Sequence, residues 1–173
     1  ALPIYSSGTK NPAPSLYIYH YDHNFKPALP PMARDRDHSG SSKTLKIDTV
    51  YTVHSNSLLM FPQKGLYFVQ QDTNGNDGFS FLVVDDKYPK VTKVKDLVEQ
   101  LIYITTKEER KRLINSKRPK EALDDFWIDI ARDENYARRL IKLYYERVEF
   151  SNRNFTSYKE GWETDRGMIY IIY

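Results

Sequence analysis

The spacing of the apolar residues changes once along the chain, and this change restricts the possible folds more than any other feature. Between residues 44 and 84, β-branched and aromatic residues alternate with polar ones, as in strands that bury one face. After Pro89 the apolar residues recur every three or four positions, as on the buried side of a helix. Strands that precede helices, instead of alternating with them, predict an α+β fold. The expected strands are residues 16–21, 45–53, 57–61, 65–70 and 79–84.

Four helical stretches and a last strand are expected in the second half. A stripe of apolar residues runs through 94–102, a short basic helix covers 108–114, and a third helix covers 122–131 with Ile130 on its apolar face. A helix of about 20 residues follows from Tyr136 to beyond Val148. Thr105–Glu109 and Asp133 supply helix starts, because their side-chain oxygens can accept free backbone amides. The apolar run at 168–173 predicts a final β-strand.

These patterns give three segments and a fold class. Residues 1–42 form a loop-rich lead-in with one strand, 43–88 a β-rich domain, and 89–173 a helical domain that ends in a strand and is truncated. The fold class is α+β: an N-terminal antiparallel β-sheet or partial sandwich, an α-helical region, and the final β-strand. The chain begins at Ala1 instead of Met and ends on the apolar run, so we expect a piece of a longer protein.

The composition excludes several classes of site. The chain has no Cys, so disulfides, thiolate metal sites and cysteine nucleophiles are excluded within it. Its apolar stretches are too short to span a membrane. A net charge of +3 is too small to predict nucleic-acid binding. Residues 107–120 carry seven basic side chains, but acidic neighbours dilute them, which favours a solvated helix and loop.

No group of residues completes a catalytic or metal site. Residues 72–78 resemble a calcium loop only in part, because Asp77 and Val83 stand where Gly and Glu are needed, and a hairpin loop is favoured. His20 and His23 would point to opposite faces of a strand, which does not favour a metal. The carboxylate pairs lie at expected helix starts and solvated faces. We therefore predict no catalytic residue, no metal, no cofactor and a non-enzymatic protein.

Three tyrosines alternate along the first strand. Tyr17, Tyr19 and Tyr21 would cover one strand face, since successive side chains of a strand point to opposite sides. Such a face is suited to binding a sugar, or to packing under a loop with the hydroxyls in water. The three residues are therefore possible ligand-binding positions, and carbohydrate is a possible partner.

The segment 160–168 is the least generic part of the sequence. It places an aromatic side chain, a hydroxyl, two acids and an Arg between Gly161 and Gly167. A physical interpretation is a tight turn in which Thr164 caps, Asp165 accepts backbone amides and Arg166 pairs with a carboxylate. Trp162 would then close the core. A binding corner is the alternative interpretation.

This segment resembles the signature of the GWxTD domain family of bacterial envelope proteins. The resemblance covers about residues 58–173. It implies no reaction and no catalytic residues, and the matching residues carry over as motif positions whose role is unassigned. The signature positions are Gly161, Trp162, Thr164, Asp165 and Arg166. Further matching positions lie upstream, at 103–108, 126–127, 144–148 and 152–156.

The resemblance implies an exported cell-envelope protein of diderm bacteria, in the periplasm or at the outer membrane. It is compatible with a lipid anchor that lies outside this segment. We expect a non-enzymatic interaction or structural component of an outer-membrane-associated assembly, with other envelope proteins as partners. The alternative is a carbohydrate-binding or carbohydrate-processing module of the cell surface, for which the three tyrosines and the carboxylates near Trp162 are the motivation.

Overall fold

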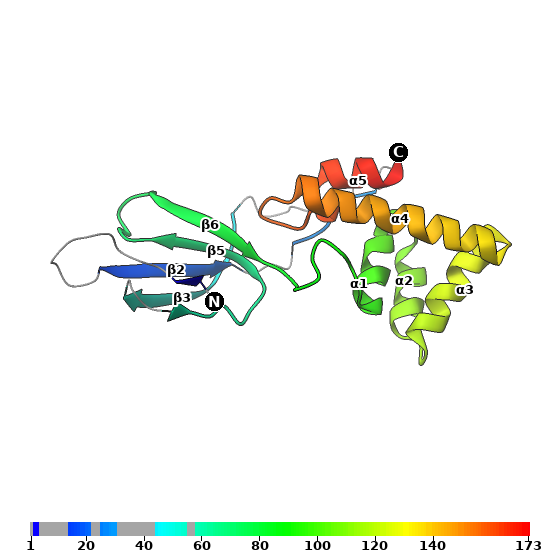
Figure 1. Cartoon of the computed structure of the whole chain (residues 1–173), viewed down its shortest axis with the longest axis horizontal. Coiled ribbons are helices and arrows are strands. Elements are labelled where there is room, and N and C mark those ends of the chain that lie inside the picture. The colour runs from blue at the N-terminus through cyan, green and yellow to red at the C-terminus, as the bar shows by residue number, and fades with distance from the viewer. Residues whose placement is uncertain (1, 4–13, 22–24, 31–43, 55–57) are drawn as a thin grey trace. The chain divides into compact units, whose positions relative to one another are not determined.

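The chain forms two compact units, a β-sheet unit and a helical unit. The computed structural model describes residues 2–3, 14–21, 25–30, 44–54 and 58–173. The sheet unit consists of Ala1–Phe25 and Ser41–Asp85, and the helical unit consists of Lys26–Gly40 and Asp86–Tyr173. Figure 1 shows the elements of both units. Strands come first and helices follow, so the predicted α+β class with an N-terminal antiparallel sheet is confirmed.

The sheet unit is built on four antiparallel strands. Their order across the sheet is β3-β2-β5-β6, and a separate two-residue pair joins β1 to β4 (Figure 1). β2 forms the centre with β5, where Ile18 lies opposite Val69 and Tyr19 opposite Phe68. The strands are β1 (Leu2–Pro3), β2 (Ser15–Tyr21), β3 (Ile47–His54), β4 (Leu58–Leu59), β5 (Gly65–Gln70) and β6 (Gly78–Val83).

Alternation along the strands produces the small core of this unit. Ile18, Tyr67 and Val69 are buried on one face, where Phe61 packs edge-on against the Tyr67 ring at 4.9 Å. The predicted hairpin joins β5 to β6, and the Asp72 carboxylate accepts the Asn74 amide at 2.9 Å within its loop. An Asx turn of this kind is a structural use of the residues that resembled a calcium loop.

The helices begin after Pro89, as the change of period predicts. Thr106 and Glu109 form a reciprocal capping box at the start of α2, and the Asp133 carboxylate accepts the Tyr136 amide at the start of α4. Both caps satisfy amide donors that a helix leaves free at its first turn. The helices are α1 (Val94–Gln100), η2 (Leu101–Tyr103), α2 (Lys107–Ile114), α3 (Pro119–Ala131), α4 (Glu134–Phe155), η3 (Gly161–Glu163) and α5 (Asp165–Ile172).

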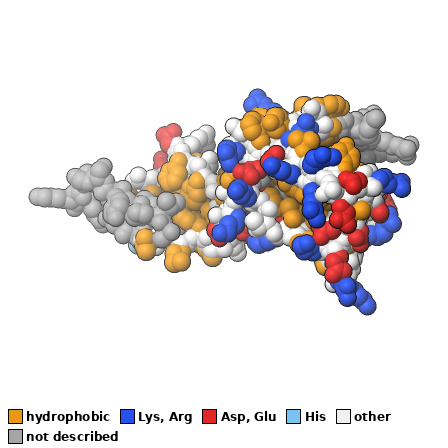
Figure 2. Space-filling view, turned by 45° about the vertical axis from the view of Figure 1, so that its right-hand side comes forward, with side chains coloured by type: hydrophobic (Ala, Val, Ile, Leu, Met, Phe, Trp, Pro, Cys, Tyr) orange, Lys and Arg blue, Asp and Glu red, His pale blue; other side chains and the backbone are white. Residues whose placement is uncertain are grey.

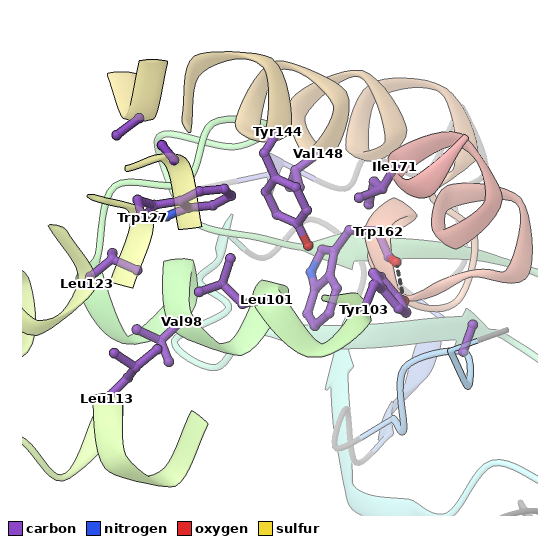
Figure 3. Close-up of a cluster of buried hydrophobic side chains, with 13 residues drawn as sticks. Val98, Leu101, Tyr103, Leu113, Leu123, Trp127, Tyr144, Val148, Trp162 and Ile171 are labelled. Carbon is purple, nitrogen blue, oxygen red and sulfur yellow. Dashed lines mark hydrogen bonds between the residues drawn. The ribbon is translucent and has the colours of Figure 1, made fainter. Parts of the chain in front are cut away.

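One apolar core lies between these helices. In Figure 3 the side chains of α1, α3 and α4 meet those of η3 and α5, and the Trp162 and Tyr103 rings lie close together. The buried members labelled there are Val98, Leu101, Tyr103, Leu113, Leu123, Trp127, Tyr144, Val148, Trp162 and Ile171. Ile130, predicted on the buried side of α3, is instead 50% exposed, because Leu123, Trp127 and Ala131 form the buried stripe.

The predicted final β-strand is wrong, because residues 165–172 form helix α5. The same apolar run satisfies a helical spacing, since Gly167 and Ile171 are buried while Ile169 and Tyr170 are exposed. The run therefore does not pair as a strand, and the helical domain does not end in one. Packing of α5 on α4 and the cap from Thr164 outweigh the strand preference of Ile and Tyr, since β-propensity depends strongly on context.

Candidate functional site

The signature segment forms a corner between the end of α4 and the start of α5, here named the 160–167 corner. Two glycines allow the backbones of α4, η3 and α5 to approach one another closely. A Cβ at Gly161 would lie 1.9 Å from the Ser151 carbonyl oxygen, and a Cβ at Gly167 would lie 1.9 Å from the Gly161 carbonyl oxygen. No side chain fits at such distances, so both positions require glycine for close approach of backbone to backbone.

Trp162 is the buried centre of the corner. Its backbone amide donates to Asn152 Oδ1 at 3.0 Å, and its indole Nε1 donates to Glu160 Oε2 at 2.8 Å. The Tyr103 hydroxyl donates to the Trp162 backbone carbonyl at 2.7 Å, and this hydrogen bond is drawn as a dashed line in Figure 3. Its backbone and side chain are therefore tied to η2 and α4 as well as to the core.

Asn152 joins the corner to the segment that precedes α1. Besides accepting the Trp162 amide, its side-chain amide donates to the Pro89 carbonyl at 3.2 Å. Its own carbonyl accepts the hydroxyls of Tyr88 at 2.8 Å and Thr156 at 2.6 Å. The Asn152 side chain is almost fully buried, so each of these bonds replaces water that is absent there. In the sequence, Asn152 was noted only within the positions 152–156 that resemble the family. Its buried role was not predicted, because nothing local distinguishes it from an asparagine on a helix surface.

Thr164 caps as predicted, but the element that it caps is helix α5 instead of a turn before a strand. Its hydroxyl accepts the Gly167 amide at 3.0 Å and donates to the Gly161 carbonyl at 2.7 Å. The single side chain thus links the end of η3 to the first turn of α5. This reciprocal use of a hydroxyl is specific to Ser and Thr, which explains the residue type at this position.

The predicted partners of Asp165 and Arg166 are wrong. Both side chains are exposed in the first turn of α5. Within the described residues, no hydrogen bond joins the Asp165 carboxylate to a backbone amide and no ion pair joins Arg166 to a carboxylate. The Gly167 amide, in the same helix turn, donates to the Thr164 hydroxyl. These two positions therefore face solvent, whereas Gly161, Trp162 and Thr164 hold the corner together.

Two carboxylates lie close together at the corner. The Glu163 carboxylate accepts the Glu160 amide at 3.1 Å, and the Glu163 carbonyl accepts the Ala28 amide at 2.8 Å. Burial, together with the nearby Glu160 charge, raises the pKa of Glu163 to about 7. Burial also raises the pKa of Tyr88, near the Glu160 and Glu163 carboxylates, and the pKa of Tyr103, near the Glu163 carboxylate. The corner can therefore hold a proton on Glu163 at neutral pH.

Family comparison supports the sequence resemblance. Residues 65–173, from the first residue of β5 to the residue after α5, match the model of the GWxTD domain. The chain belongs to the GWxTD domain family. No curated protein and no solved structure matches it. In this GWxTD domain the signature residues Gly161, Trp162 and Thr164, together with Gly167, make the contacts of the 160–167 corner described above.

Beside the corner lies an apolar surface, here named the α4–α5 aromatic surface, formed by the rings of Phe150, Phe155 and Tyr170, with Ile169 next to Tyr170 in α5. The rings of Phe150 and Tyr170 stack with centroids 4.4 Å apart, and Phe155 packs edge-on against both. Phe150 and Tyr170 are exposed, and Ile169 is 53% exposed. Exposed hydrophobic side chains lie among Lys and Arg side chains on the face shown in Figure 2. Large aromatic side chains are usually largely buried, so this surface was not predicted from the sequence.

The three predicted tyrosines share one face of β2. Tyr17, Tyr19 and Tyr21 are each partly exposed, whereas Ile18 and His20 on the other face are buried. The Gln70 side-chain amide donates to the Tyr19 hydroxyl at 2.9 Å. The structure therefore brings the three tyrosines together on the sheet. They belong to the sheet unit, whereas the signature positions belong to the helical unit.

His20 has a structural environment. Its Nδ1 lies 3.1 Å from Asp48 Oδ2, its Nε2 lies 3.0 Å from the Lys64 carbonyl, and its ring packs on Tyr67. His23 lies outside the described residues. Within the described residues, no three His, Asp or Glu side chains are grouped so that they could bind a metal ion.

Proposed function

We propose that this GWxTD domain is an interaction domain of a protein assembly in the bacterial cell envelope. The α4–α5 aromatic surface is the observation that carries the proposal. Large exposed apolar side chains that contact one another are typical of surfaces that bind other proteins. Here they flank a corner whose two glycines and buried hydrogen bonds fix the direction of α5.

The corner provides the rigidity that such a surface needs. Arg147 donates from its guanidinium to the Ile171 carbonyl at 3.0 Å, which ties the last turn of α5 to α4. With Thr164 at the other end, both ends of α5 are held, and Tyr170 is kept against Phe150. A surface that is ordered before binding loses less conformational entropy on association.

The envelope location, export and a lipid anchor outside this segment are part of the proposal and rest on family resemblance. None of the helices that the structure describes has the length and apolar character needed to cross a membrane. In this proposal the partners are other envelope proteins of an outer-membrane-associated complex.

Affinity purification of the native protein, with and without a charge on the aromatic surface, tests the proposal. Ile169→Lys places a cation next to Tyr170 on α5, and Ile130→Lys is the matched control, since Ile130 is similarly exposed on α3. The wild type and the Ile130→Lys protein should retain a stoichiometric envelope partner, which Ile169→Lys loses. Recovery of the wild type as a stable monomer without such a partner would contradict the proposal.

A second candidate is carbohydrate binding on the tyrosine face of β2. The observation that favours it is the row of partly exposed rings with the Gln70 amide beside Tyr19, since aromatic faces next to amide groups suit sugar rings and their hydroxyls. We expect the wild type and the Tyr51→Ala protein to bind sugars on a glycan array. The Tyr19→Ala protein should not bind. Tyr51 is the control because it lies on the opposite face of the sheet, across from Ile18. Absence of wild-type binding at about millimolar sugar removes this candidate.

A further inference from the structure

The two edges of the four-stranded sheet differ in how they are protected. Edge strands present unpaired backbone groups that can pair with another chain, and proteins commonly protect them with charges, prolines or bulges. The β3 edge carries Asp48 and is irregular in register where it pairs with Tyr21. The β6 edge, at the opposite side of the sheet in Figure 1, is Gly-Phe-Ser-Phe-Leu-Val, with no charge, no proline and a regular register with β5.

In the described part of the chain, β6 pairs with β5 alone. Alternate residues of β6 therefore direct their amide and carbonyl groups away from the sheet. On the core face, Phe79 and Phe81 stack at 6.0 Å, and Phe81 stacks on Tyr67 at 5.5 Å. Phe79 is nevertheless 54% exposed. A further strand beside β6 would pair the outward backbone groups and cover the Phe79 ring.

We infer that the β6 edge binds an extended segment of another protein, which adds a fifth strand to the sheet. The amide and carbonyl groups that β6 directs outward can hydrogen-bond to a second extended backbone. The exposed ring of Phe79 favours an apolar side chain on the same face of the added strand. This inference goes beyond the proposed function, because β6 belongs to the sheet unit and the α4–α5 aromatic surface belongs to the helical unit.

The charges at the two ends of β6 indicate which charges the bound segment should carry. Asp77 precedes the strand, and Asp85 and Asp86 follow it after Val84. Asp85 pairs with Lys64, whereas Asp77 and Asp86 are exposed and make no ion pair with a described residue. The complementary segment therefore has an uncharged, alternately apolar centre with Lys or Arg at its ends.

The same charges disfavour a second copy of this chain as the occupant. Antiparallel pairing of two β6 strands with Phe79 and Phe81 on one face overlaps most when Ser80 lies opposite Ser80, or Phe81 opposite Phe81. In the Phe81 register Asp77 of one copy lies opposite Asp85 of the other, and in the Ser80 register Asp77 lies opposite Val83, diagonal to Asp85. Like charges across neighbouring strands destabilise pairing.

Selection from a phage-displayed library of random peptides about 12 residues long tests the inference on the whole chain. We expect peptides with an alternating apolar centre and basic ends, which protect the amides of residues 78–83 from deuterium exchange. Phe79→Lys should weaken their binding at least about tenfold. Val50→Lys is the matched control, because Val50 is 49% exposed on the β3 edge, and its binding should be unchanged.

Three outcomes would overturn the inference. The first is that no peptide is selected, and the second is that Phe79→Lys and Val50→Lys affect binding equally. The third is a wild-type dimer in sedimentation that Phe79→Lys dissociates, which would make a second copy the occupant. Circular dichroism of both variants should match the wild type, so that lost binding is not lost folding. Because these variants leave α5 unchanged, failure here leaves the test with Ile169→Lys intact.

Discussion

Gly167→Ala gives the sharpest test of the 160–167 corner, because two physical effects predict opposite signs. Gly167 is the third residue of α5, where helix propensity alone predicts that alanine stabilises by about 0.5 to 1 kcal/mol. The close approach predicts the reverse. The new Cβ would lie 1.9 Å from the Gly161 carbonyl oxygen, and backbone must move by more than an ångström to accept it.

The expected magnitude follows from the contacts that this movement disturbs. Overpacking costs about 1 to 3 kcal/mol, and displacing α5 weakens the Thr164 bonds to Gly161 and Gly167, each worth about 1 kcal/mol. After subtracting the propensity gain, we expect Gly167→Ala to lower the free energy of unfolding of the helical unit by about 2 kcal/mol.

Urea unfolding followed by helical circular dichroism at 222 nm measures this change. Arg166→Ala is the matched control on the neighbouring residue, since Arg166 is exposed, and it should change the free energy of unfolding by less than about 0.5 kcal/mol. A Gly167→Ala protein as stable as the wild type, or more stable, would refute the close-approach argument.

Three further predictions concern the same corner. Because the pKa of Glu163 is raised from its ordinary 4.5 to about 7, the folded state binds more protons than the unfolded state between these values, so stability falls as pH rises through them. Glu163→Gln should therefore match the wild type near pH 4 and exceed it at pH 8 by up to about 3 kcal/mol in urea unfolding; equal stability at both pH values would contradict the assignment. Tyr103→Phe leaves the buried Trp162 carbonyl without its 2.7 Å donor and should cost about 1 to 3 kcal/mol in thermal or urea unfolding, with Tyr136→Phe, at an exposed ring, as the near-neutral control. Thr164→Ala should cost about 1 to 2 kcal/mol through the lost cap, whereas Asp165→Ala should cost less than about 0.5 kcal/mol; the reverse order would restore Asp165 as the residue that satisfies the amides.

Local patterns predicted most of the secondary structure because they express local physics. Alternation fixed the strands around Ile18 and Val69, and the caps at Thr106 and Asp133 marked helix starts whose hydrogen bonds form within a few residues. The capping role of Thr164 was predictable for the same reason. Such bonds depend on neighbours in sequence, so the sequence carries them directly.

The candidate site was only partly predictable. The signature marked Gly161, Trp162 and Thr164, and the pattern correctly suggested that Trp162 closes the core. The partners of Trp162, which are Tyr103 and Asn152, lie 59 and 10 residues away in sequence, and no local signal links them. Asp165 and Arg166 were given partners because charges near a turn commonly pair, but α5 turns both side chains to solvent.

The amino-acid sequence by itself determined the α+β class, the order of strands before helices, the caps and the family. Tertiary structure alone decided that 165–172 is a helix, that Phe150 is exposed beside Tyr170, and that β6 is an edge strand. The physical reason is that the run of Ile and Tyr residues satisfies a strand and a helix almost equally well in isolation. Only contact with α4, at glycines that let the backbones meet, selects the helix and fixes which side chains remain in solvent.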